Sequence, residues 1–170
     1  MPMLSELESY KAKILNMIIR DEECVELIAC RKGMQMPATN LVNDRIFMYD
    51  YVDETVKDQK VFICIEIDEG ELGNIVSRYF DIHIYVVVHK ALMDYTDDEG
   101  RGGVRRDAIC SRIDHLINGS PDFGFKKLEA SYGGRIVFSN DFRAKDLHYR
   151  ALGKNLWGEA LDRQEQFAID

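Results

Sequence analysis

Histidine is the residue type in this sequence best suited to acid–base or metal chemistry near neutral pH. The four histidines are His83, His89, His115 and His148. His83 and His89 are both on the polar face of a predicted strand, and the strand rise separates them by roughly 20 Å. Two side chains so far apart cannot bind one metal ion. We therefore expect the strand histidines to lie on an exposed face or at an interface.

The acidic loop Asp94-Tyr95-Thr96-Asp97-Asp98-Glu99-Gly100 has the composition of a calcium-binding loop, but its spacing differs from the EF-hand pattern. Glu66 and Asp68, at the end of another predicted strand, could hold Mg²⁺ in a nuclease. The lysine expected two residues after the strand carboxylate is missing, because Glu69-Gly70 follows. A metal-binding enzyme domain is kept only as an alternative.

Gly100, Gly102 and Gly103 precede a predicted helix, as in loops that hold phosphate. No Walker lysine or serine follows, however, and the carboxylates before the glycines repel phosphate. The sequence contains no G-x-S-x-G motif, no Cys/His nucleophile pair and no C-x-x-C pair, and its four cysteines fit buried thiols. We therefore predict no enzymatic activity, no cofactor and no metal site.

The element best placed to organise the chain is a predicted strand with five apolar residues at alternate positions, namely Phe80, Ile82, Ile84, Val86 and Val88. After an acidic, glycine-rich loop that is too polar for regular structure, the apolar period becomes helical from Val104 to Asn118. Gly119 provides the helix end. We expect Ile82, Ile84 and Val86 to pack against the apolar stripe of this helix, on Ile109, Ile113 and Leu116.

The rest of the chain predicts two N-terminal helices, a strand over residues 60–68 paired antiparallel with the first strand, and three short strands over residues 127–132, 135–139 and 142–152. A second helix from Asp21 is expected to stop at Gly33, and Gly133-Gly134 to form a hairpin turn. The fold class predicted is α+β, a mainly antiparallel sheet with helices packed on one face. We expect one domain over residues 1–155 and a C-terminal docking segment over residues 156–170.

Composition excludes several kinds of partner. The formal net charge is −8, from 22 basic and 30 acidic residues, which disfavours tight binding of nucleic acid or anionic lipid. The N-terminus does not resemble a signal peptide, and no apolar run approaches the ~20 residues of a membrane span. We expect a soluble protein made inside the cell.

With no catalytic constellation, the sequence favours a binding or assembly role. Two acidic loops are expected to project from the same strand pair, and an aromatic C-terminal segment has no evident place in the core. The residues that we expect at contacts with other subunits or partner proteins are Glu69, Glu71, Asp97, Asp98, Glu99, Arg105, Arg106, Trp157 and Leu161.

Several short runs resemble one family of phage proteins. These runs are Val87-Val88-His89-Lys90, Asp94-Tyr95, Gly102-Gly103-Val104-Arg105-Arg106-Asp107-Ala108-Ile109, Ile113-Asp114-His115-Leu116-Ile117-Asn118-Gly119, Phe123-Gly124-Phe125-Lys126-Lys127-Leu128-Glu129 and Tyr149-Arg150-Ala151-Leu152. They are similar to tail-terminator proteins, also called tail-completion or neck proteins, of long-tailed bacteriophages and of phage-tail-like bacteriocins. The resemblance covers roughly residues 60–152.

The resemblance implies a small α/β domain with a helix-covered sheet, which forms a homo-hexameric ring in a virion or tail-like particle (tailocin). Such a ring caps the tail tube, joins it to a head-side connector protein, and assembles in the bacterial cytoplasm without cofactor or membrane. DNA can pass through it, and the acidic charge suits a conduit that should not bind DNA tightly. Another head–tail connector or tail-tube protein is the alternative within virions. The segment 156–170 has no counterpart in the resemblance.

Overall fold

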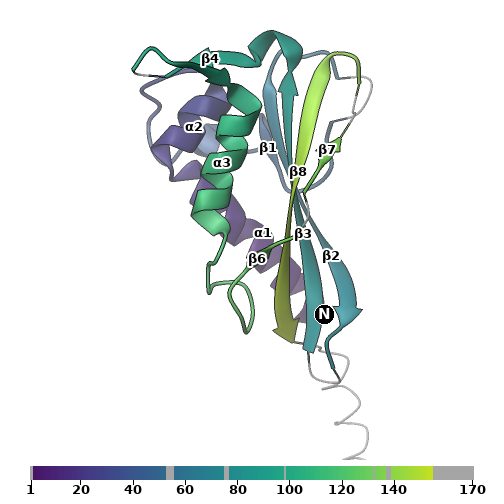
Figure 1. The fold of residues 1–170 in the computed structure, drawn as a ribbon. Coiled ribbons are helices and arrows are strands. Elements are labelled where there is room, and N and C mark those ends of the chain that lie inside the picture. Colours follow the sequence, from purple (N-terminus) through teal and green to yellow (C-terminus); the bar gives the residue numbers. More distant parts are fainter. Residues whose placement is uncertain are drawn as a thin grey trace, which may run out of the picture.

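The computed structural model describes residues 2–52, 56–74, 77–97, 99–131, 133–136 and 139–154. Within these ranges, three α-helices lie on one face of a six-stranded sheet, which confirms the predicted α+β class (Figure 1). The helices are α1 (Pro2–Ile19), α2 (Glu22–Ala29) and α3 (Arg105–Ile117). The sheet contains β1 (Ile46–Phe47), β2 (Val61–Leu72), β3 (Ser77–His89), β6 (Glu129–Ala130), β7 (Arg135–Ile136) and β8 (Phe142–Lys154). A separate hairpin joins β4 (Asp94–Thr96) to β5 (Gly102–Val104), and the short 3₁₀ helices are η1 (Thr39–Leu41) and η2 (Lys90–Leu92).

Three long antiparallel strands form the centre of the sheet. The strand order is β1-β2-β3-β8-β6, and β7 pairs with β8. The predicted antiparallel pairing of the two strongest strand patterns is confirmed, with Ile65 opposite Ile84. β8 pairs antiparallel with the other edge of β3 along its whole length. The two-residue strand β1 pairs with β2 in parallel.

The main core lies between the helices and the sheet. All five apolar residues at alternate positions of β3 are fully buried there, as predicted, together with Ile109 and Ile113 of α3. Leu116 lies at the rim of the same cluster and is partly buried. The period of two therefore identified the correct face of β3, since within the described ranges this is the face that the helices cover.

A second, smaller apolar cluster lies on the opposite face of the sheet, which we call the open face because no helix in the described residues covers it. Phe62, Cys64, Val87 and Phe142 are buried in this cluster near one end of the sheet. Phe47 stacks there on Tyr51, with 3.8 Å between the ring centroids. β2 is therefore apolar on both faces in its first half and polar on the open face in its second half.

The helix ends follow the capping rules with one correction. Asp21 caps α2 by accepting a hydrogen bond from the Cys24 amide at 2.9 Å. α2 ends earlier than predicted: Cys30, not Gly33, follows its last turn in the left-handed conformation, with φ of 56°. α3 ends at Ile117 and Gly119 has φ of 77°, as the sequence predicts.

Two expectations for the loops are wrong. β6 and β7 do not form a hairpin with each other; each pairs with β8. The reason lies at Gly133, where a Cβ atom would come within 2.3 Å of the Asp146 carbonyl oxygen, so the glycine lets this segment run against β8. The loop after β3 is also regular in part, since β4 and β5 pair across it and Gly103 lies against the Tyr95 ring.

The two acidic loops do not project from the same end of the strand pair. The β2–β3 turn lies at the lower end of the sheet in Figure 1, and the β4–β5 hairpin lies at the upper end. The 13 residues of β3 separate them, which at about 3.3 Å per residue is on the order of 40 Å. A partner that contacts both loops of one subunit must span this distance.

Candidate assembly surfaces

The carboxylates of the upper loop stabilise the loop itself. Asp97 accepts hydrogen bonds from the amides of Glu99 at 3.0 Å and Arg101 at 2.8 Å, and the Arg101 Nε donates to its other oxygen at 2.9 Å. The bond from the Arg101 side chain is the main reason that the pKa of Asp97 lies below its usual value. Glu99 forms an ion pair with the same guanidinium at 3.0 Å. Asp98 lies outside the described residues.

Arg105 and Arg106, which begin α3, differ in their contacts. Arg105 donates from Nε to the Leu92 carbonyl oxygen at 2.8 Å and from Nη1 to the Leu27 carbonyl oxygen at 3.2 Å, so it ties α2 to the segment after β3. It also borders a pocket between α2 and the β4–β5 hairpin, which Glu26, Leu27 and Arg31 line from the other side. Arg106 forms a surface ion pair with Asp107 at 3.0 Å. Arg105 is therefore committed to contacts within the fold, whereas the Arg106 side chain, which is 19% exposed, pairs with its sequence neighbour.

The carboxylates of the lower end are more available to a partner. Glu69 forms an ion pair with Arg78 across the β2–β3 turn. The Asp68 and Glu71 side chains are exposed and form no ion pair or side-chain hydrogen bond with any described residue. The β2–β3 register shifts between Glu69 and Leu72, and the irregularity leaves the Leu72 side chain 59% exposed.

The open face carries a histidine pair that the sequence did not reveal. His83 of β3 and His148 of β8 lie opposite each other with parallel rings, 4.3 Å apart at their centroids. The His83 Nδ1 lies 2.9 Å from an Asp146 carboxylate oxygen, and the His148 Nε2 lies 3.0 Å from the Asp81 Oδ1. Each imidazole thus contacts a carboxylate on the neighbouring strand, and all four side chains are about four-fifths buried.

Arg150 extends this polar row toward the lower end. Its Nε donates to the Asp81 Oδ1 at 3.0 Å, so Asp81 accepts from both Arg150 and His148. Burial is the largest single influence on the pKa of Asp81 and would raise it, but the two hydrogen bonds together hold the pKa below its usual value. The row cross-links β3 and β8 through contacts between polar side chains. A signal was present in the alternation of Asp81 and His83, but their partners on β8 could not be read before the pairing was known.

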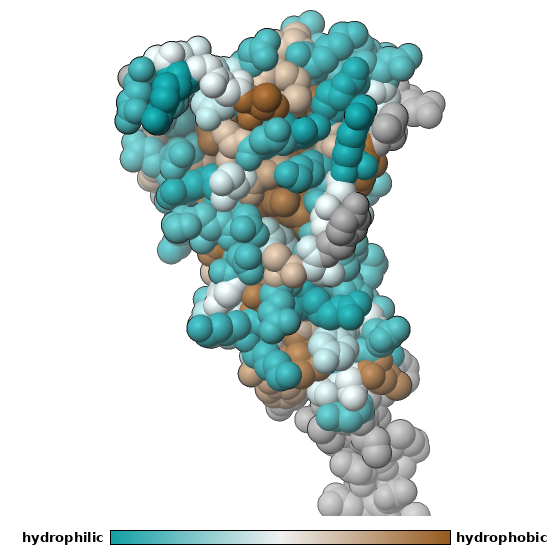
Figure 2. Space-filling model, in the orientation of Figure 1, coloured by the Kyte–Doolittle hydropathy of each residue, from teal (hydrophilic) through white to brown (hydrophobic). Residues whose placement is uncertain are grey.

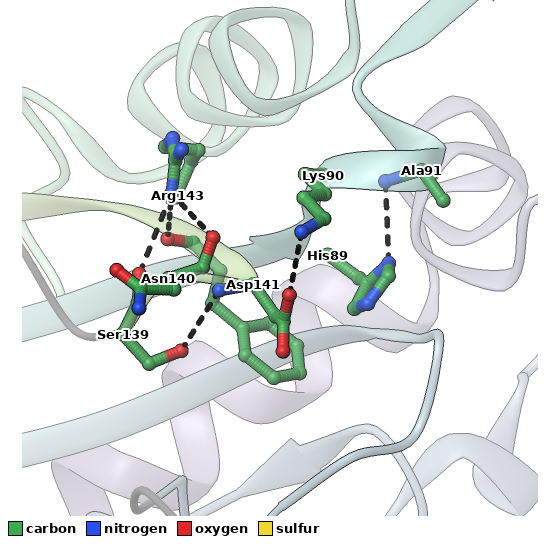
Figure 3. A network of polar contacts seen from close by, with 8 residues as sticks. His89, Lys90, Ala91, Ser139, Asn140, Asp141 and Arg143 are labelled. Atoms are coloured by element: carbon green, nitrogen blue, oxygen red, sulfur yellow. Dashed lines mark hydrogen bonds and ion pairs between the residues drawn. The ribbon is translucent and has the colours of Figure 1, made fainter.

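His89 has a structural role at the upper end, where the chain leaves β3 (Figure 3). Its Nδ1 accepts a hydrogen bond from the Ala91 amide at 3.2 Å and so caps η2. Lys90 pairs with Asp141 at 2.6 Å, and Arg143 donates to the carbonyl oxygens of Ser139 and Asn140. These contacts fix the turn that leads into β8.

The described residues show no group of three or more His, Cys, Asp or Glu side chains arranged to hold a metal ion. Cys24 and Cys110 are buried, and burial is the main cause that raises the pKa of each thiol to about 12. A thiol in that state is a poor nucleophile near neutral pH. In the described helices there is no segment long and apolar enough to cross a membrane.

Trp157 and Leu161, which were predicted to contact partners, lie outside the described residues. The structure adds other exposed apolar side chains instead. Tyr49 and Tyr51 lie near the second apolar cluster and are 50% and 38% exposed, and Phe125 is 58% exposed near the end of β8. Figure 2 shows hydrophobic residues as separate patches on a mainly hydrophilic surface.

Comparison with known proteins identifies the family and the fold. No curated protein sequence matches the chain. Among solved structures, a chain from "Virion of native gene transfer agent (GTA) particle" is 12% identical, with a TM-score of 0.52 over 85% of this chain and 94% of that chain. This likeness shows a shared fold. The model of the YomW family matches residues 14–151, which include α2, α3 and most of the sheet, and the chain therefore belongs to the YomW family.

Proposed function

We propose that this protein is a structural subunit of a phage-like virion, and specifically a ring subunit that caps the tail tube and joins it to the head-side connector. The observation that carries the proposal is the shared fold with a component of a gene transfer agent virion, which extends over 94% of that component. Such complete coverage means that the whole folded unit, rather than one motif, is alike. The proposed role is structural and non-enzymatic.

Three features of the described residues support an assembly role. Carboxylates and exposed apolar side chains occur at both ends of the sheet, where neighbouring subunits or tail and head proteins could contact them. The His83 and His148 side chains contact carboxylates across the β3–β8 pair, His89 caps η2, and Cys24, Cys64 and Cys110 are buried. The net charge of −8 disfavours adsorption of DNA to a ring through which DNA passes.

The second candidate is another head–tail connector or a tail-tube subunit. This candidate is kept because the similar chain comes from a whole virion particle. The likeness of fold therefore points to no single position within such a particle. Both candidates are assembly parts and differ in location and stoichiometry.

The test measures assembly and location. Native mass spectrometry of the purified protein should show a species of six chains, each of 19.6 kDa, and electron microscopy should show a ring with a central channel. Immunogold labelling of particles from the producing bacterium should place the protein at one end of the tail tube. Labelling along the tube, or around the portal side of a head, would favour the second candidate, and a monomer that labels no particle would contradict both.

A further inference from the structure

The lower end of the sheet has two flanks of opposite charge. The acidic flank is the end of β2, with Asp68, Glu69, Glu71 and Leu72; the basic flank is the segment Phe125–Lys127. β3 and β8 lie between them, since Leu72 pairs with Arg78 and Gly124 bridges to Leu152. Three strand spacings separate the flanks, which is about 14 Å. They are thus distinct surfaces at one end of one molecule.

Each flank combines an exposed apolar side chain with unpaired charges. Leu72 is 59% exposed and Phe125 is 58% exposed. Asp68 and Glu71 on one flank, and Lys126 and Lys127 on the other, are exposed and have no ion pair with any described residue. Glu129 is also exposed beside the basic flank, but it lies opposite Arg150 in the β6–β8 pair.

We propose that the acidic flank of one subunit binds the basic flank of the next subunit, so that the partner of this surface is a second copy of the chain. Leu72 and Phe125 would lose their exposed area in the contact, and the carboxylates would face the lysine ammonium groups around them. This is the usual anatomy of an interface, an apolar centre with a charged rim. Contact between two acidic flanks, or between two basic flanks, places like charges together and is disfavoured.

The proposed contact joins two different surfaces and is therefore head-to-tail. Such a contact repeats from subunit to subunit, and it closes into a ring when the rotation per subunit allows. Only the closure of these contacts into a ring rests on the proposed function, and the contact between the two flanks does not. Opposite charge at the contact also predicts that high salt weakens assembly, since the flanks are exposed to solvent.

The test uses charge reversal on the full chain. One variant carries Asp68→Lys and Glu71→Lys, and so has two basic flanks; the other carries Lys126→Glu and Lys127→Glu, and so has two acidic flanks. Sedimentation velocity should show that each variant alone is at least tenfold weaker in assembly than the native protein. An equimolar mixture should assemble again, because basic and acidic flanks then alternate around the ring.

The chain with all four changes should also assemble, because the charges are exchanged rather than lost. The matched control, Arg20→Glu with Asp58→Lys, reverses two exposed charges away from the lower end and should assemble like the native protein. Recovery in the mixture also shows that neither variant is misfolded. Normal assembly of both single-flank variants, or loss without recovery in the mixture, overturns the docking proposal and leaves the ring intact. A native protein that stays monomeric at low salt overturns the ring and the docking contact together.

Discussion

Arg112 of α3 binds both carboxylate oxygens of Asp21, the residue that caps α2. Its Nε donates to the Asp21 Oδ1 at 2.9 Å and its Nη2 donates to the Oδ2 at 2.6 Å. Asp21 also accepts a hydrogen bond from the Cys24 amide. One side chain therefore caps α2 and also pairs with an arginine that lies 91 positions later in the sequence. A planar guanidinium that contacts two oxygens holds both the distance and the orientation of its partner. This contact fixes α2 against α3 beside the core.

The pairing makes part of the stability depend on pH. The Arg112 hydrogen bond is the main reason that the folded-state pKa of Asp21 lies below its usual value of 3.8, and burial opposes it. A lowered folded-state pKa gives stability that is present above the unfolded-state pKa and is lost as pH falls through the folded-state value. We expect Asp21→Asn to unfold at lower urea than the native protein at pH 7, and the difference to shrink below about pH 4.

Asparagine still caps a helix, so this substitution removes the charge and keeps the cap. Glu22→Gln, at the exposed next position, is the control and should change the urea midpoint little at either pH. A difference between Asp21→Asn and the native protein that stays constant from about pH 7 to about pH 3 would show that the ion pair has no part in the effect.

Ile84 tests the main core. It is fully buried in the middle of β3 and belongs to the same cluster as Ile109 and Ile113. Ile84→Ala should lower the free energy of unfolding by about 2–5 kcal/mol, because the site loses apolar contact and retains a cavity. Val104→Ala, at a 41% exposed position of β5 away from the proposed subunit contact, should change it by less than about 1 kcal/mol. Equal effects at the two positions, measured in denaturant, would contradict the assigned core.

Most of the central fold could be predicted because local pattern and global packing agree. The alternating apolar residues in β3 and the apolar stripe in α3 each identify the buried face. Apolar residues that recur with the period of a strand or a helix indicate an element with one face covered. The antiparallel pairing of β2 and β3 follows from a short connection. The end of α3 follows from glycine at a left-handed position.

The assembly surfaces could not be predicted in the same way, because they depend on which strands become neighbours. His83 and His148 are far apart in the sequence, and only the β3–β8 register brings their rings together. The second apolar cluster was not predicted, because Phe62 and Cys64 meet Val87 and Phe142 only once the strands are paired. The sequence placed both acidic loops on one strand pair, and in the structure they lie at opposite ends of β3.

Gly133 tests the path of the segment beside β8. A Cβ atom there would meet the Asp146 carbonyl oxygen at 2.3 Å, well inside van der Waals contact. Gly133→Ala should therefore lower the free energy of unfolding by about 1–3 kcal/mol, as overpacking does. Gly102→Ala is the matched control, because nothing lies within 4 Å of the Cβ position there. If both substitutions had the same small effect on the urea midpoint, the close approach of this segment to β8 would be wrong.

The upper loop gives a prediction about metal ions. Asp97 already accepts hydrogen bonds from two backbone amides and from the Arg101 guanidinium, so a cation would have to displace these contacts. Calorimetric titration with Ca²⁺ and with Mg²⁺ should show no site tighter than millimolar. A micromolar site that disappears on Asp97→Asn and Asp98→Asn would instead assign a metal to the loop and revive the alternative of a metal-binding domain.

The C-terminal segment 156–170 gives the last prediction, which comes from the sequence because the segment lies outside the described residues. Trp157 and Leu161 fall on one side of a predicted helix of about 12 residues, a length that is marginal alone in water, so the segment must dock on something. We expect it to dock on a neighbouring subunit or on an adjoining tail or head protein. Deletion of residues 156–170 should then leave the melting temperature within a few degrees of the native value.

The same deletion should weaken ring formation or attachment to tails, because a tryptophan that fills a pocket often dominates an interface. Sedimentation velocity on the truncated protein measures the first effect, and binding to isolated tail tubes measures the second. Trp157→Ala in the full chain is the companion variant, since it removes the proposed anchor and keeps the length. A truncated protein that melts far below the native one, while its folded fraction still forms rings normally, would show that the segment packs on its own domain and is not an interface.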